Sequence, residues 1–202
     1  NLNVGAEFGL WQDRLTGSVD FFYRKTSDML FQVPVAPSMG YSSYYDNIGD
    51  MANTGVEVVL NGDIFRTRNV VWSVNANLTW VKNKVLSLPE SRKDRTVDGH
   101  EGFISGSTFL AEGLPLNTLY IHEYAGVNPE NGLSMWNKKD DSVEGGWRTT
   151  TDYGEISSDH DSKKLYDSTL ADIFGGFGTS LYAYGFDFSI AFDYQLGGTT
   201  LD

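Results

Sequence analysis

The chain has 202 residues, a formal net charge of −12 and no cysteine. Its length suffices for one sizeable core, and the lack of cysteine excludes a disulfide framework and a thiolate metal site within these residues. The negative charge argues against nucleic acid as a partner, because phosphate binding needs a basic surface. With 22 glycines and 14 % aromatic residues, the composition favours strands and turns over helices.

Six segments alternate apolar and polar residues with a period of two, which is typical of β-strands with one apolar face. They cover residues 2–10, 15–24, 54–64, 70–81, 175–183 and 186–195. A less regular pair of strands is expected at 103–110 and 119–127, on either side of the breaker at 112–115. The sequence therefore predicts an all-β, antiparallel chain of about eight strands.

The connections between these segments alternate between short and long. Short turns are expected near Trp11, Arg66, Gly113 and Gly185, and long loops over residues 25–52, 82–99 and 132–170. In an up-and-down sheet every second connection lies at the same end, so the short turns share one end and the long loops the other. Transmembrane β-barrels have this asymmetry, with short periplasmic turns and long extracellular loops. A soluble sandwich has no reason to sort its loops in this way.

The two faces of each strand allow two interpretations. Along residues 186–195, phenylalanine and isoleucine face one way and Asp187 and Asp193 the other. In a soluble sandwich the apolar face would form the core, whereas in a membrane barrel it would face lipid. Trp72 and Trp80 bracket the apolar face of their strand, as an aromatic girdle would. Together with the sorted loops, they favour a transmembrane β-barrel segment.

Several blocks of sequence resemble SusC/RagA-like TonB-dependent outer-membrane transporters. The most specific is Asn-Ile-Gly-Asp-Met-Ala-Asn-Thr-Gly-Val-Glu at residues 47–57. Further similar blocks, in the order of that family, lie at residues 17–30, 72–85, 126–132 and 186–189 with 195–198. Together these blocks cover most of the chain, so the set is more specific than any single block.

The resemblance implies the wall of a large barrel whose lumen is filled by a plug. It also implies a place in the outer membrane of a Gram-negative bacterium of the Bacteroidota, in contact with its lipid. Such proteins import glycans or peptides with energy supplied through TonB, beneath a SusD-like surface lipoprotein, and they are not enzymes. Residues 1–202 are expected to form part of a single barrel domain, without the plug or the TonB-contacting segment. Two alternatives stay open: a soluble all-β carbohydrate-binding module and a passive porin-like barrel.

Aromatic residues in the long loops are candidate contacts for a ligand or a partner. They are Tyr41, Tyr44, Tyr45, Trp136 and Trp147. Such rings can stack on a sugar or anchor a protein interface. They can equally pack within their own loops or lie at the lipid interface.

Four acidic residues in the strands, Asp20, Glu57, Asp187 and Asp193, are expected to face the lumen and to set its polarity. They lack the fixed separation in a cleft that paired catalytic carboxylates need. A second acidic set, Asp152, Glu155, Asp159 and Asp161, could bind Ca²⁺ through its oxygens. Its spacing differs from a known calcium loop, so a solvated acidic loop is favoured. The three histidines show no ligand spacing, and no metal or cofactor is expected.

Overall fold

The computed structural model describes residues 1–35, 37–47, 49–157 and 159–201. Its largest unit is a six-stranded antiparallel sheet with the strand order β1-β2-β5-β6-β15-β16, which we call the wall sheet. Its strands are β1 (Leu2–Leu10), β2 (Leu15–Thr26), β5 (Asp50–Arg66), β6 (Val70–Ser87), β15 (Ile173–Ala183) and β16 (Phe186–Leu196). These six strands confirm the six alternating segments of the sequence.

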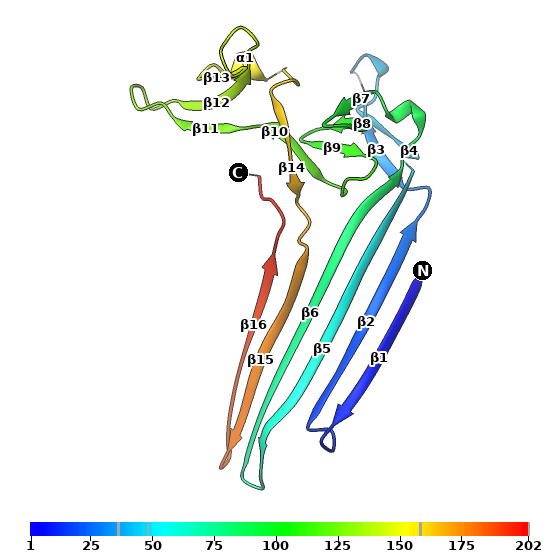
Figure 1. Ribbon diagram of the computed structural model, residues 1–202, viewed down its shortest axis with the longest axis vertical. Helices are drawn as coiled ribbons and strands as arrows, with labels where there is room; N and C mark the ends of the chain where they lie inside the picture. Colours follow the sequence, from blue (N-terminus) through cyan, green and yellow to red (C-terminus); the bar gives the residue numbers. More distant parts are fainter. Residues whose placement is uncertain (36, 48, 158, 202) are drawn as a thin grey trace.

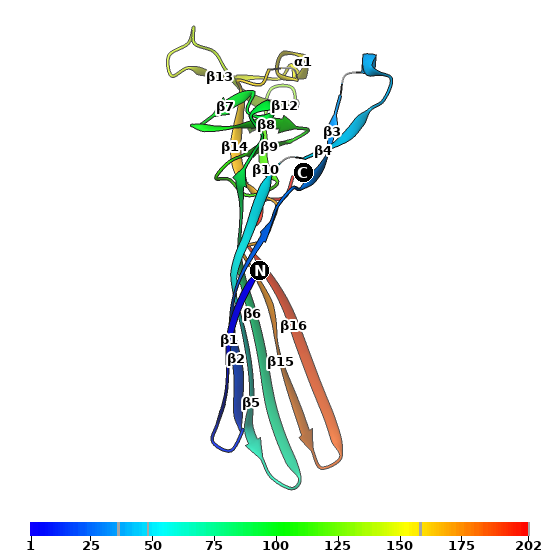
Figure 2. The ribbon, with the colours of Figure 1, turned by 90° about the vertical axis from the view of Figure 1, so that its right-hand side faces the viewer.

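The remaining elements gather at one end of the wall sheet, and we call them the head (Figures 1 and 2). A five-stranded sheet has the order β14 (Lys163–Ser168), β10 (Thr118–His122), β9 (Thr108–Ala111), β8 (His100–Ser105), β7 (Arg95–Val97). A three-stranded sheet contains β11 (Tyr124–Val127), β12 (Ser134–Lys139) and β13 (Trp147–Thr150), and β3 (Leu30–Pro34) pairs with β4 (Ser43–Asn47). The short helices are η1 (Pro37–Met39), η2 (Glu90–Arg92) and α1 (Tyr153–Ile156).

The connections of the wall sheet are sorted as expected. Short turns at residues 11–14, 67–69 and 184–185 lie at the end opposite the head (Figures 1 and 2). Tyr184 and Gly185 have φ angles of 51° and 92°, as a two-residue turn of type I′ requires. The other two connections lead into the head. The asymmetry predicted from loop lengths is therefore confirmed.

The pairing register puts the alternating apolar residues that the sequence predicts in all six strands on one face of the wall sheet. Val58 lies directly between Val19 and Leu78, and Phe177 lies between Ala76 and Phe192. No other element packs over this face in the described residues, and side chains as large as Phe186 remain 81 % exposed. A soluble sandwich would bury such a surface. The register therefore confirms a transmembrane β-barrel segment.

One part of the expected topology is wrong. The segments at 103–110 and 119–127 do not join the wall sheet but contribute β8 to β11 in the head. The breaker near Gly113 is also within the head, where the Gly113 amide donates to the Val85 carbonyl at 2.9 Å. Consecutive buried residues in β9 and β10 explain the difference, because a barrel strand would alternate.

Buried residues concentrate in the head, in two clusters. The first joins Val85 at the end of β6 to Leu88, Phe103 and Leu110, with Met29 packed against it. The second contains Phe109, Ala111 and Tyr120 and is contacted by Val97 and Leu165. The head is thus a packed structure fixed to the ends of the wall strands. No helix of the described residues is long and apolar enough to cross a membrane.

Candidate functional site

In the stretch 47–57, Asn47, Gly49 and Asp50 join the wall to the head by a set of polar contacts. The side-chain oxygen of Asn47 accepts from the Gly49 amide at 2.8 Å, and its NH₂ group donates to Asp28 at 2.9 Å. Asp50 accepts from the Asp28 amide at 3.2 Å and forms an ion pair with Lys25 at 2.8 Å. Asp28 and Gly49 both have positive φ, which asparagine, aspartate and glycine tolerate best. This junction fixes where β5 enters the wall sheet.

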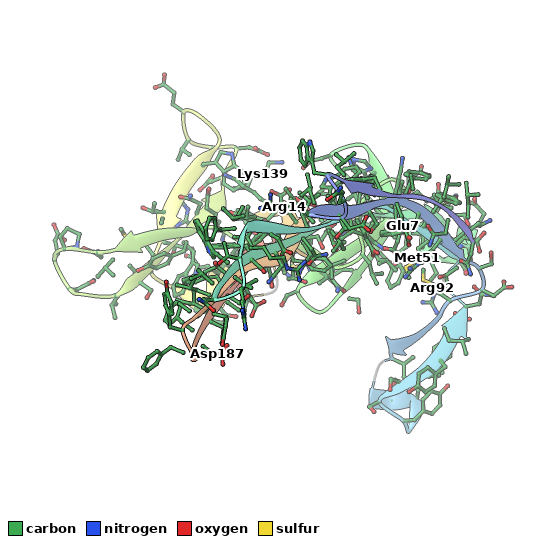
Figure 3. The ribbon with its side chains drawn as sticks, turned by 90° about the horizontal axis from the view of Figure 1, so that it is seen from below. Glu7, Arg14, Met51, Arg92, Lys139 and Asp187 are labelled. Atoms are coloured by element: carbon green, nitrogen blue, oxygen red, sulfur yellow. The ribbon has the colours of Figure 1, made fainter. Side chains whose placement is uncertain are left out.

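The three candidate tyrosines lie in the β3–β4 hairpin, which extends from one side of the head (Figures 2 and 3). Tyr44 accepts a 2.6 Å hydrogen bond from Arg92, whose guanidinium also forms an ion pair with Asp46. The same guanidinium lies 5.7 Å from the ring centre of Phe103. Tyr41 and Tyr45 are 50 % and 70 % exposed. Tyr44 therefore fastens the hairpin to the head, while Tyr41 and Tyr45 are open to a partner or ligand.

Trp136 lies in a groove of about 920 Å³, which we call the aromatic groove. Its ring meets that of Tyr153 edge-on at 5.5 Å between centres. Tyr124 and Tyr166 also line the groove, together with polar groups such as Glu123. A concave surface with several rings and a few polar groups is typical of small-molecule sites.

Trp147 lies elsewhere, in a second cavity of about 800 Å³ beside β7 and β14. The ammonium of Lys164 stands 4.7 Å from the Trp147 ring centre. The structure therefore does not bring the five candidate aromatics together. The tyrosines lie in the β3–β4 hairpin, whereas Trp136 and Trp147 line two different cavities that share Lys163.

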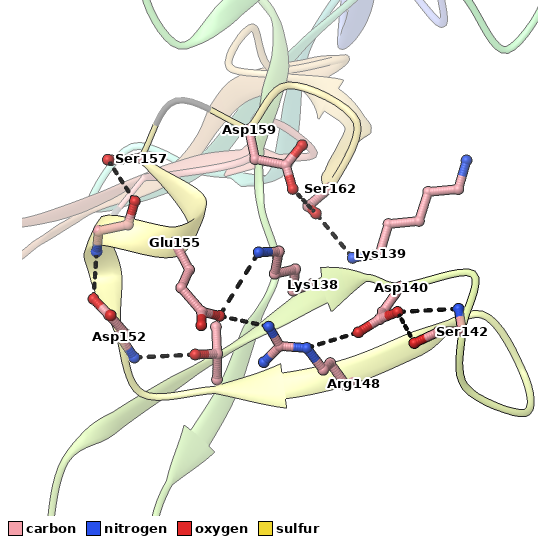
Figure 4. A network of polar contacts seen from close by, with 12 residues as sticks. Lys138, Lys139, Asp140, Ser142, Arg148, Asp152, Glu155, Ser157, Asp159 and Ser162 are labelled. Carbon is pink, nitrogen blue, oxygen red and sulfur yellow. Dashed lines mark hydrogen bonds and ion pairs between the residues drawn. The ribbon is translucent and has the colours of Figure 1, made fainter.

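A polar network holds β12, β13 and α1 around these cavities (Figure 4). Arg148 donates to Asp140 at 3.0 Å and to Glu155 at 2.6 Å. Its hydrogen bond and charge lower the pKa of Glu155. Asp152 caps α1 by accepting from the Gly154 amide at 2.8 Å. The network ties β12, β13 and α1 together through ion pairs within the protein.

The network also accounts for the acidic set considered for Ca²⁺. Asp152 is the helix cap and Glu155 the partner of Arg148. Asp159 accepts from the Ser162 hydroxyl at 2.6 Å and the Asp161 amide at 2.9 Å. Within residues 1–35, 37–47, 49–157 and 159–201, no group of three or more His, Cys, Asp or Glu side chains is arranged to hold a metal ion.

The four acidic strand residues share the face of the wall sheet opposite the apolar face. Asp20 and Glu57 are direct neighbours across β2 and β5. On the other edge, Asp187 lies opposite Tyr182 and Asp193 opposite Gly176. The expected division of the sheet into an apolar and a polar face is therefore confirmed. That the polar face lines a lumen stays a prediction.

Several residues of the head were not anticipated from the sequence. Arg92, which fastens the hairpin, lies in a short charged loop without any periodicity. The cavity beside Trp147 is lined by Arg95, Lys139, Lys163 and Lys164. The two Lys-Lys pairs, at 138–139 and 163–164, could have indicated this cluster of positive charge, because they interrupt a mainly acidic segment.

A sheet with one mainly apolar face, short turns at one end and a large head at the other defines the wall of a transmembrane β-barrel. The chain belongs to the family of TonB dependent receptor-like β-barrels, whose family model matches residues 1–200. Proteins of this family are transporters and receptors of the outer membrane and are not enzymes.

Similar proteins come from Bacteroidota. TonB-dependent receptor P3 of Formosa agariphila is 32 % identical across 100 % of this chain, and TonB-dependent receptor SusC of Bacteroides thetaiotaomicron is 27 % identical across 94 %. These alignments cover 20 % and 18 % of the two relatives, so the chain spans about a fifth of their length. The structure of the RagAB peptide importer in the "closed-closed" state matches 97 % of the chain and 21 % of that protein, with 29 % identity and a TM-score of 0.74.

Proposed function

We propose that residues 1–202 form part of the barrel wall and extracellular surface of a SusC/RagA-type importer in the outer membrane of a member of the Bacteroidota. The complete protein would move peptides or oligosaccharides inward with energy supplied through TonB. The observation that supports this proposal best is the combination of an uncovered apolar face, formed by all six wall strands, with a head built at one end only. The family match over residues 1–200 supports it independently.

In this proposal the short turns face the periplasm and the head faces the outside. The polar face of the wall sheet, with Asp20 and Glu57 side by side, would line the lumen and meet the plug. Asp187 and Asp193 would line it further along. The segment would supply wall, lumen surface and loops, and it would carry out no bond chemistry.

A SusD-type surface lipoprotein is the partner we propose for the head. The similar RagAB structures are described as a peptide transporter and a peptide importer. Tyr41 and Tyr45 on the projecting hairpin are exposed aromatic residues, the type that anchors protein interfaces. The aromatic groove around Trp136 is the better candidate for contact with cargo, because it is concave.

Topology can be tested with two epitope insertions in the full-length protein. One insertion follows Glu144, in the exposed β12–β13 connection, and the other follows Tyr184, in a short turn. We expect antibody to reach the first in intact cells, and the second only after the outer membrane is permeabilised. Equal labelling of both in intact cells, or extraction of the protein without detergent, would contradict the proposal and favour the soluble module.

Import can be tested by comparing uptake of labelled peptide and oligosaccharide mixtures in cells with and without TonB. We expect uptake through the full-length protein to stop without TonB, and the mixture that is depleted identifies the cargo class. Uptake that continues without TonB would favour the passive porin. The proposed partner is tested by co-purification. We expect a surface lipoprotein to co-purify with the full-length protein, and the double substitution Tyr41→Ala with Tyr45→Ala to reduce its yield.

A further inference from the structure

The second cavity of the head has a lining unlike the rest of this acidic protein. It has a volume of about 800 Å³ and four cationic side chains, Arg95, Lys139, Lys163 and Lys164, contribute to its lining. Trp147 adds a 38 % exposed ring. We call this space the cationic cavity. The whole chain carries a net charge of −12, whereas at this cavity the four cations outnumber the three aspartates that also line it.

The fold builds this cavity by curling the five-stranded sheet. β7 and β14 are its two edge strands, yet Val97 of β7 and Leu165 of β14 pack against the same buried cluster around Phe109. Burial of these side chains therefore brings the two edges together. As a result Arg95 of β7 and Lys163 of β14 line one cavity.

Three of the four cations lack an acidic partner. Arg95, Lys139 and Lys163 form no ion pair with any carboxylate in the described parts of the chain, whereas Lys164 is paired with Glu123 at 2.6 Å. The Lys139 side chain extends away from the polar network (Figure 4). Elsewhere in the head, cations such as Arg92, Lys93 and Arg148 each meet a carboxylate. Among the lysines and arginines of the described head, those without a carboxylate partner are therefore the three that line this concave surface.

Burial and the nearby positive charges lower the pKa values of both Lys163 and its neighbour His160. Burial and the charge of Arg95 lower the pKa of Lys163. Burial also lowers the pKa of His160, and the charges of Lys163 and Arg95 add to that effect. Two like charges held half-buried beside each other cost stability unless an anion compensates them.

The cavity also contains groups that can accept hydrogen bonds. Asp94, Asp98 and Asp161 line it, all three exposed, and none lies in an ion pair with its cations. A strongly acidic peptide would bring further carboxylates against these three. A sugar unit carrying one acidic group would instead offer them its hydroxyl hydrogens and place a ring face on Trp147. The mixed lining therefore favours an acidic sugar.

We propose that the cationic cavity binds a carboxylate- or sulfate-bearing unit of an oligosaccharide. Arg95 and Lys163 would hold the anionic group, Lys139 would approach from the open side, and Trp147 would contact the sugar ring. This inference deepens the proposed import function and rests on it, because it makes acidic oligosaccharides the cargo class.

The test measures, by calorimetry, how tightly trigalacturonate, galactotriose and triglutamate bind to the purified full-length protein in detergent. We expect trigalacturonate to bind, and binding to weaken as salt concentration rises. Lys163→Met and Arg95→Met should each weaken binding by about tenfold, the usual effect of losing a charged hydrogen bond. Lys163→Arg keeps the charge and should retain binding.

Lys82→Met is the matched control. Lys82 is exposed on β6, forms no ion pair within the described residues and lies outside the cavity, so its loss removes one charge without touching the site. The inference is overturned if trigalacturonate fails to bind, if Lys163→Met and Lys82→Met bind equally well, or if triglutamate or galactotriose binds as tightly. Each variant is shown to be folded if its unheated sample migrates differently from its heated sample on electrophoresis.

The outcomes for this inference and for import are distinguishable. TonB-dependent uptake of a neutral cargo, with no binding of trigalacturonate, overturns the acidic ligand and leaves import standing. Binding that depends on Lys163, in a protein without TonB-dependent uptake, leaves the site standing and removes the import function.

Discussion

The hydroxyl of Tyr194 on β16 donates a 3.0 Å hydrogen bond to the carbonyl oxygen of Asn77 on β6, two strands away. The strand between them is β15, where Gly175 pairs with Tyr194 on one side and Leu78 on the other. The tyrosine side chain crosses the sheet above Gly175. A Cβ atom there would lie 2.8 Å from the Tyr194 oxygen and would also collide with the Asn77 carbonyl.

We therefore expect Gly175→Ala to destabilise the folded barrel by about 1–3 kcal/mol, the usual cost of overpacking. Tyr194→Phe keeps the ring and loses only the hydrogen bond, so it should cost about 1 kcal/mol. Urea unfolding of the full-length protein in detergent, followed by tryptophan fluorescence, measures both. A Gly175→Ala variant as stable as the original protein would show that the tyrosine does not require the glycine.

The opposite face has a similar pairing between Phe22 and Gly55. Phe22 is 5 % exposed, its ring covers Gly55 of the next strand, and the Arg24 guanidinium lies 4.8 Å from the ring centre. Phe22→Ala should cost about 3–5 kcal/mol, as for other buried phenylalanines. Phe21→Ala is the matched control, because Phe21 is 40 % exposed on the apolar face, where lipid replaces the lost contacts. Equal losses in urea unfolding would contradict the assignment of the two faces.

The wall sheet was predictable because its signal is local. Every wall strand alternates over about nine residues or more, and a one-residue slip would move an entire apolar set to the polar face. The sequence also identified 47–57 as a family marker, and the structure supplies physical reasons for two of its glycines. Gly49 has a φ of 99°, and Gly55 lies beneath Phe22.

The head was not predictable in this way, because its strands are short and its pairings are distant in sequence. β10 pairs with β14, where Tyr120 lies opposite Leu165, and no local period signals such a contact. The edges of the five-stranded sheet meet only because Val97 and Leu165 share one buried cluster. The candidate aromatics were identified by residue type, but their separation into three places depends on this long-range packing.

The assignment of lipid and lumen faces can be tested with neighbouring valines. Val58 lies on the apolar face between Val19 and Leu78, whereas Val59 lies on the polar face between Ser18 and Asn77. Val58→Arg should cost about 2–4 kcal/mol, the usual penalty for arginine facing the centre of a bilayer.

Val59→Arg is the matched variant, since it adds the same side chain one residue further along and should be tolerated. The measurement is the free energy of unfolding of the full-length protein in lipid vesicles, with folding yield as a second readout. If Val59→Arg were the more damaging variant, the two faces would be exchanged.

The ion pair between Arg92 and Asp46 predicts a pH-sensitive attachment of the β3–β4 hairpin. The hydrogen bond from Arg92 lowers the pKa of Asp46 below its ordinary value. A group with a lowered folded pKa contributes stability that is complete above its unfolded pKa, about 3.9 for aspartate, and is lost as pH falls through the folded pKa. The hairpin should therefore stay attached from neutral pH down to about pH 4 and loosen only below it.

The attachment can be followed in the full-length protein with a spin label on the thiol that Met39→Cys introduces. Met39 is an exposed residue of η1, near the hairpin tip. We expect the label to become more mobile below about pH 4. Asp46→Asn should produce that mobility already at neutral pH, because the amide cannot form the ion pair. Asp141→Asn, which removes an exposed carboxylate with no ion pair in the described residues, should leave the spectrum unchanged. A label that is equally mobile at pH 7 in the original protein and in Asp46→Asn would mean that Arg92 does not hold the hairpin.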